Sequence, residues 1–101
     1  MIYVIARSEI KPEFMDEYIA IAKENIPNVL AEEGCIFYVL NTDAATGIAA
    51  QKSSPTATTF VECWESLDHL KKHLAAPHMA VFMKKVADMR VSSTLQIVEP
   101  A

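Results

Sequence analysis

Two stretches of this chain are apolar at consecutive positions, and this restricts the kind of sheet that they can form. Residues Met1–Ser8 and Cys35–Leu40 have the Ile, Val and aromatic content of β-strands. Successive side chains of a strand point to opposite faces, so runs such as Ile2–Ile5 make both faces of a sheet apolar. A sheet of this kind has to be covered on two sides.

The segment between these strands has the spacing of an amphipathic helix. Over Glu13–Glu33, with Pro12 near the first helical position, apolar residues recur at helical intervals: Met15, Tyr18, Ile19, Ala22, Ile26, Val29 and Leu30. Pro27 interrupts this pattern, so we expect a kink or a short break near Lys23–Asn25. Gly34 is expected to end the helix, because glycine adopts a left-handed cap without a steric penalty.

The second half of the chain repeats the alternation of strand and helix. Thr59–Glu65 alternates with period two, as a strand does. A helix is predicted from the N-cap Ser66 to about Ala75, and it restarts at Pro77 and runs to about Arg90. Val91–Val98 is the last predicted strand.

The order of elements predicts an α+β, ferredoxin-like βαββαβ domain that spans residues 1–101. Its four-stranded antiparallel sheet would carry both helical segments on one face. The segment 41–58 is the least regular part of the chain, and Ile48–Lys52 is expected to add a short strand within it. Because the chain supplies only one cover for the sheet, we expect the sheet of a second copy to cover the other face in a homodimer.

Composition and charge exclude several classes of protein. With 9 Lys and Arg against 13 Asp and Glu, the net charge is −4, and we expect no nucleic-acid partner. No apolar run reaches the roughly 18 residues of a membrane span. The first twelve residues include three charged ones and fit no signal peptide, so we expect a cytoplasmic protein. Cys35 and Cys63 have no metal-ligand spacing and are expected to be reduced and structural.

A glutamate lies between two aromatic residues on the third predicted strand. Phe60, Glu62 and Trp64 alternate with Val61 and Cys63, so the first three share one face. Glu62 could be an interface residue paired with a Lys or Arg, or a cavity residue that orients a ligand hydroxyl or a histidine. Trp64 could be an ordinary core residue, or a cavity wall that stacks on a flat ligand.

The three histidines of the chain lie within ten residues of each other. His69 and His73 are spaced i, i+4, which allows joint metal ligation, but no third ligand is evident and we expect no metal. His73 and His78 are each candidates for a general base near neutral pH. The start of a helix at Pro77 favours the neutral form of His78. Each histidine could also be an ordinary exposed or capping residue.

Three motifs, in this order and spacing, resemble the antibiotic biosynthesis monooxygenase (ABM) domain, and most closely its small bacterial quinol-monooxygenase-like members. The resemblance covers essentially the whole chain and rests on Glu32-Glu33-Gly34-Cys35 leading into Tyr38, on Glu62-Cys63-Trp64-Glu65-Ser66, and on His73-Leu74-Ala75-Ala76-Pro77-His78.

The resemblance implies a dimeric α/β-barrel with a pocket in each subunit between sheet and helices. Many members of the family oxidise quinols or phenols with O2 and use no flavin, haem or metal. On the matching positions His73 and His78 would be base and polariser in an order that stays open. Glu62 would orient one of them or the substrate, and Trp64 would wall the pocket. The other candidate pocket residues are Phe60, Tyr38, Phe82 and Met79.

Two departures from the family pattern narrow this expectation. Polyketide-oxidising members have an Asn where this chain has Phe60, and haem-degrading members have an iron-ligating His in the region of Phe82-Met83. We therefore expect no haem ligation here. Two alternatives to a quinol monooxygenase stay open, namely an isomerase or tautomerase of a small carbonyl metabolite and a non-enzymatic, ligand-binding dimer.

Overall fold

Four strands and three α-helices follow one another in the predicted order in the computed structural model, which describes all residues 1–101. The elements are β1 (Ile2–Ile10), α1 (Met15–Leu30), β2 (Cys35–Thr42), β3 (Ala57–Trp64), α2 (Leu67–Leu74), α3 (Pro77–Val86) and β4 (Arg90–Val98), with short 3₁₀ turns at Pro12–Phe14 and Ala87–Met89. The predicted ferredoxin-like fold is confirmed, with its second helix divided into α2 and α3.

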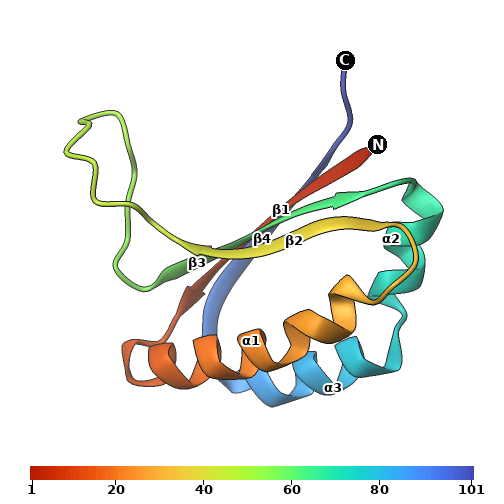
Figure 1. Cartoon of the computed structure of the whole chain (residues 1–101). Helices are drawn as coiled ribbons and strands as arrows, with labels where there is room; N and C mark the ends of the chain where they lie inside the picture. The colour runs from red at the N-terminus through yellow and green to blue at the C-terminus, as the bar shows by residue number, and fades with distance from the viewer.

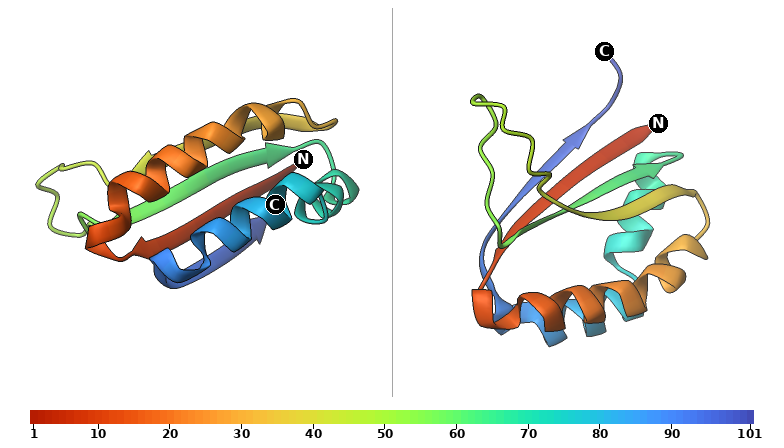
Figure 2. Two further views of the ribbon diagram at one scale, coloured as in Figure 1. Left: turned by 90° about the horizontal axis from the view of Figure 1, so that it is seen from below. Right: turned by 60° about the vertical axis from the view of Figure 1, so that its left-hand side comes forward.

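The four strands form one antiparallel sheet in the order β2-β3-β1-β4. Helices α1 and α3 lie side by side under this sheet, and α2 closes one end (Figure 1, Figure 2). All helices therefore cover the same face, which we call the inner face. None of the helices combines the length and the apolar composition that crossing a bilayer requires.

The strand register decides which side chains meet on the inner face. Glu62 on β3 is paired with Val4 on β1 and with Tyr38 on β2. All three side chains are buried, and so are Phe60 and Trp64 on either side of Glu62. The hydrophobic core thus lies between the sheet and the helices, and a carboxyl group is placed in the middle of it.

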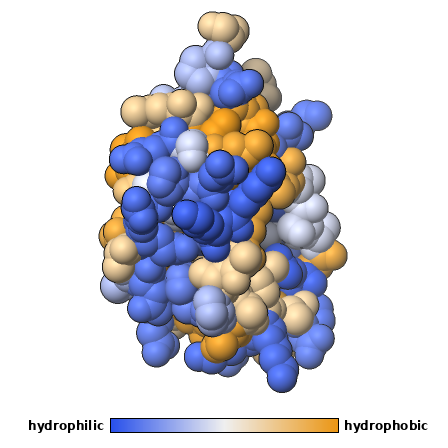
Figure 3. Space-filling view, turned by 90° about the vertical axis from the view of Figure 1, so that its right-hand side faces the viewer, coloured by the Kyte–Doolittle hydropathy of each residue, from blue (hydrophilic) through white to orange (hydrophobic).

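The opposite, outer face of the sheet has no cover within the chain. Large apolar side chains on this face are about half exposed, notably Ile5, Val39 and Val98. Figure 3 views the end of the molecule near α2, where hydrophilic side chains fill the middle and a hydrophobic group lies above them, toward the sheet. The sequence expectation of a two-sided apolar sheet with a single internal cover is confirmed.

The segment 43–56 is an arm that leaves the sheet on the side away from the helices (Figure 1, Figure 2). Arg7 on the outer face holds its base through two bonds to the Asp43 carboxylate, at 2.7 Å each. At the other end, the Ser54 hydroxyl donates to Glu9. The prediction of a short strand at Ile48–Lys52 is wrong, because this stretch has no neighbouring strand to pair with and is bonded by its own side chains instead.

Helix α1 continues through the predicted interruption. Residues Lys23–Asn25 are helical, and Pro27 lies inside the helix, so the expected break is absent. The helix buries Tyr18, Ala22 and Val29 against the sheet. Burial of this apolar stripe offsets the one backbone hydrogen bond that proline cannot make.

Gly34 holds the turn between α1 and β2 in a conformation that other residues rarely adopt. Its φ is +83°, and a Cβ atom at this position would come within 2.3 Å of the His69 ring. Two separate constraints, a left-handed backbone and a close approach, therefore require glycine here. The turn they fix carries Glu32.

We predict that Gly34→Ala destabilises the fold by more than Gly47→Ala does. Gly47 also has a positive φ, +70°, but no atom lies within 4 Å of the added methyl group. Gly47→Ala should therefore cost only the backbone penalty of about 1–2 kcal/mol, whereas Gly34→Ala adds the clash with His69. Urea unfolding of both variants measures the difference, and equal losses would contradict the role of the His69 contact.

Candidate functional site

A cavity of about 260 Å³ lies between the inner face of the sheet and the helices. Its size is near the lower end for ligand pockets, so it suits a small molecule. Leu95 and Ile97 of the edge strand β4 line it and are about half exposed, so the cavity opens along this edge. Six of the eight predicted site residues line it, namely Tyr38, Phe60, Glu62, His73, Met79 and Phe82.

The walls of the cavity are largely aromatic. Tyr38 stacks on Phe60 with ring centroids 4.8 Å apart, and Phe82 meets Phe60 edge to face at 6.4 Å. Burial raises the pKa of the Tyr38 hydroxyl, and the nearby Glu62 adds to the shift. Tyr38 therefore stays a neutral phenol, which can donate a hydrogen bond to a ligand.

Glu62 is the carboxyl group at the centre of the inner face. It is buried, and the indole Nε1 of Trp64 donates a 3.0 Å hydrogen bond to its Oε1 atom. Burial raises the pKa of Glu62, while the Trp64 bond and the neighbouring His73 oppose this shift. Trp64 itself is fully buried and is not among the residues that line the cavity, so it supports Glu62 rather than forming the expected wall.

His73 is the polar group that faces Glu62 across the cavity wall. It lies in the last turn of α2 and its ring packs on Trp64, at 4.6 Å between centroids. Its Nδ1 lies 2.7 Å from Glu32 Oε2, and its Nε2 lies 4.0 Å from Glu62 Oε1. An ionised carboxylate can only accept, so beside ionised Glu32 the hydrogen lies on Nδ1, and the neutral ring keeps its lone pair on Nε2, on the side of Glu62.

Glu32 is a site residue to which the sequence analysis assigned no role. It lies in the turn after α1 and reaches both His73 and His78, whose Nε2 atom is 3.4 Å from the same Oε2 oxygen. The resemblance included the Glu32-Glu33 pair, but nothing in the sequence separates the inward glutamate from its exposed neighbour Glu33. It is the geometry of the Gly34 turn that directs Glu32 inward and leaves Glu33 exposed.

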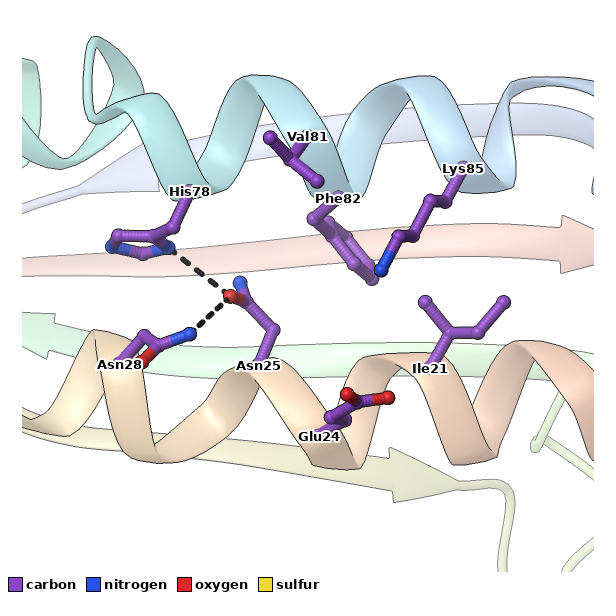
Figure 4. Close-up of a pocket in the computed structure, with 8 residues that line it drawn as sticks. All are labelled: Ile21, Glu24, Asn25, Asn28, His78, Val81, Phe82 and Lys85. Carbon is purple, nitrogen blue, oxygen red and sulfur yellow. Dashed lines mark hydrogen bonds between the residues drawn. The ribbon is translucent and has the colours of Figure 1, made fainter.

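His78 lies outside the cavity, in a groove of about 170 Å³ between α1 and α3 (Figure 4). Its Nδ1 is 3.2 Å from Asn25 Oδ1, which also accepts a bond from Asn28. The structure thus separates the two predicted catalytic histidines, with ring centroids 6.5 Å apart, and connects them through Glu32.

The remaining histidine and the cysteines form no site of their own. His69 bonds Ser66 through Nδ1 at 2.7 Å, and no group of three His, Cys, Asp or Glu residues has the geometry of a metal site. Cys35 and Cys63 are free thiols. Burial raises the pKa of Cys35 to about 11, which disfavours the nucleophilic thiolate.

Comparison with known proteins agrees with this architecture. Residues 1–85 match the family described as Antibiotic biosynthesis monooxygenase. The chain belongs to the antibiotic biosynthesis monooxygenase (ABM) family. It is 36% identical over 75 residues to the "Probable quinol monooxygenase YgiN" of Escherichia coli K12, which covers 74% of this chain and 72% of that relative.

Solved structures show the same fold over nearly the whole chain. A conserved protein from Methanosarcina mazei Go1 superposes with a TM-score of 0.87 at 24% identity, covering 99% of this chain and 92% of that one. A structure described as an antibiotic biosynthesis monooxygenase gives a TM-score of 0.84 at 25% identity, covering 100% and 99%. The ABM fold and a monooxygenase-like function are therefore supported.

We predict that Trp64→Phe raises the pKa of Glu62 further. The indole bond favours the ionised carboxylate, and phenylalanine removes that donor while keeping an aromatic ring in place. Titration of the ¹³C-labelled Glu62 carboxyl group by NMR measures the shift. An unchanged or lower value would show that the Trp64 bond does not hold the charge on Glu62.

Proposed function

We propose that this protein is a cofactor-independent monooxygenase that oxidises a small quinol or related phenol with O2. The observation that carries the proposal is the buried imidazole of His73, which lines an aromatic cavity and whose Nδ1 is held by Glu32. The kinship with a relative named as a probable quinol monooxygenase supports the same substrate class.

Deprotonation of the substrate is the step that the site is built to perform. A quinol hydroxyl that hydrogen-bonds to His73 Nε2 would lose its proton to the ring, because Glu32 stabilises the resulting imidazolium at Nδ1. The phenolate is electron-rich enough to reduce O2 itself. The chain's own residues then have only to bind the ring, hold the proton and exclude water.

The overall reaction balances without another reductant. One oxygen atom of O2 is inserted into a ring C–H bond, and the other leaves as water with the two hydroxyl protons of the quinol. The substrate supplies all four electrons, two for oxidation of the quinol to a quinone and two for hydroxylation of the ring. This reaction therefore requires no flavin, haem or metal as an electron source.

The other residues of the cavity would position the substrate. The ring would lie among Phe60, Phe82 and Tyr38, whose stacked and edge-to-face arrangement accepts a flat aromatic molecule. The raised pKa of Glu62 favours its protonated form, which places less negative charge beside a developing phenolate. Met79 completes the wall opposite the sheet.

We predict that the purified protein consumes O2 with small benzo- or naphthoquinols and that His73→Ala lowers kcat by about 10²-fold or more. Lys72→Ala is the control, since Lys72 is an exposed neighbour on α2 that does not line the cavity. An oxygen electrode, corrected for autoxidation of each quinol, measures the rates.

Different outcomes would favour different functions. Turnover of a carbonyl substrate without O2 would identify an isomerase that uses the same His73 base. Binding of quinols without turnover would favour a ligand-binding module. Equal O2 uptake by His73→Ala and the unmodified protein would refute the assignment of His73 as the base.

We also propose that two copies associate through the outer faces of their sheets. This face offers an apolar surface that includes Ile5, Val39 and Val98 and that nothing within the chain covers. An identical face related by a twofold axis can cover it in a closed dimer. The arm of residues 43–56 stands on the same side and would flank the partner subunit (Figure 2).

We predict that Ile5→Lys converts this dimer into monomers, since a charge would be buried at the centre of the interface. Leu67→Lys is the matched control, because Leu67 on α2 is 44% exposed and Ile5 is 42% exposed. Sedimentation equilibrium of both variants and the unmodified protein gives the masses. A monomeric unmodified protein, or dimers in all three samples, would contradict the proposed interface.

A further inference from the structure

Four ionisable side chains form a continuous path from the cavity to the surface groove. The path runs from Glu62 through His73 and Glu32 to His78. The two side chains at the cavity end are nearly inaccessible, with exposed fractions of 6% for Glu62 and 2% for His73, whereas Glu32 is 18% and His78 is 25% exposed. The buried base is thus connected to solvent by side chains that can each hold a proton.

One oxygen atom joins the two histidines. Glu32 Oε2 is 2.7 Å from His73 Nδ1 and 3.4 Å from His78 Nε2. The second contact is close enough for an ion pair but makes no aligned hydrogen bond, and His78 Nε2 is a buried nitrogen without a hydrogen-bond partner. This nitrogen is therefore an open acceptor beside the carboxylate.

The hydrogen-bond partners fix the direction of both rings. Asn25 Oδ1 accepts from Asn28 Nδ2 and, being a carbonyl oxygen, cannot donate, so the hydrogen of His78 lies on Nδ1 (Figure 4). His73 likewise carries its hydrogen on Nδ1, toward Glu32. Both imidazoles then accept at Nε2 and donate at Nδ1, so they point the same way along the path.

From this alignment we propose that Glu32 relays the substrate proton from His73 to His78 and so out of the cavity; this inference rests on the proposed function. His73 takes the proton at Nε2 and gives its Nδ1 proton to Glu32 Oε2. Glu32 passes a proton to His78 Nε2, and His78 releases one to water in the groove between α1 and α3. Both hydroxyl protons of the quinol are needed to form water, so the same path run in reverse returns the exported proton when the second oxygen atom leaves. This return restores the hydrogen on Nδ1 of both rings and frees His73 Nε2 for the next substrate.

Glu32 acts through His73 and is a positioning and relay residue, not a substrate contact. Without the relay, the proton would remain on the buried His73 ring after the first deprotonation. The groove that receives it is lined by Glu24 and Lys85 as well as His78, so its outer end is polar (Figure 4). Water can therefore reach the outer end of the path at His78.

Substitution of Glu32 distinguishes a role in proton transfer from a purely structural role. Glu32→Gln keeps an oxygen that can accept from His73 but cannot carry a proton, and we expect kcat with the best quinol to fall by about tenfold or more. The dissociation constant for the oxidised quinone should stay within about twofold. In Glu32→Ala, added formate should restore part of the rate. Glu33 is the exposed neighbouring glutamate. The variants Glu33→Gln and Glu33→Ala should have the kcat of the unmodified protein, and formate should not change it.

Two results would overturn the relay. The first is full turnover by Glu32→Gln, and the second is a loss of rate matched by a loss of quinone binding with no response to formate. Absence of O2 uptake by the unmodified protein would refute the proposed function instead. The relay is then decided by ¹⁵N NMR of the imidazoles in the free protein, where Nδ1–H is expected on both rings. An Nε2–H tautomer of neutral His73 or His78 would overturn it without any reaction.

Discussion

The hydrogen bond between His73 and Glu32 joins two parts of the fold that are far apart in the sequence. It connects the end of α2 to the turn between α1 and β2, at the end of the space between sheet and helices. The bond fixes the tautomer of His73 and gives the cavity its one open basic nitrogen. It depends on the Gly34 turn, which has a left-handed backbone and, lacking a Cβ atom, leaves room for the His69 ring. A backbone constraint with no chemistry of its own therefore determines the protonation state of the candidate base.

The two faces of the sheet serve different purposes. The inner face carries a carboxyl group among aromatic residues, and the helices protect it from water. The outer face carries exposed apolar side chains, among them Ile5 and Val39, which suits contact with another sheet. Because side chains alternate along each strand, β1 and β3 contribute to both surfaces at once. A substitution on one face leaves the side chains of the other face unchanged, but it can still shift their positions through the shared backbone.

The sequence was sufficient for the fold because periodicity is a local property. The alternation in Thr59–Glu65 places Phe60, Glu62 and Trp64 on one face, and the structure has them there. How deeply each of these side chains is placed relative to the cavity is not set by local sequence. Trp64 lies behind Glu62 rather than along the cavity, and His78 lies on the far side of Glu32, because helix packing sets these positions. Glu32 and Glu33 are alike in sequence, and only the turn geometry distinguishes them. The Ile48–Lys52 strand failed for a related reason, since a strand requires a partner that no local pattern can supply.

The cavity and its entrance are made from different parts of the chain. Glu32, Glu62 and His73 all lie within the residues that match the ABM family, whereas β4, whose Leu95 and Ile97 border the opening, lies beyond them. β4 is also an edge strand that no helix covers fully, so its side chains can change in size with little effect on the core. In a protein built in this way, substitutions in β4 can change which molecules enter the cavity while the residues around His73 stay the same.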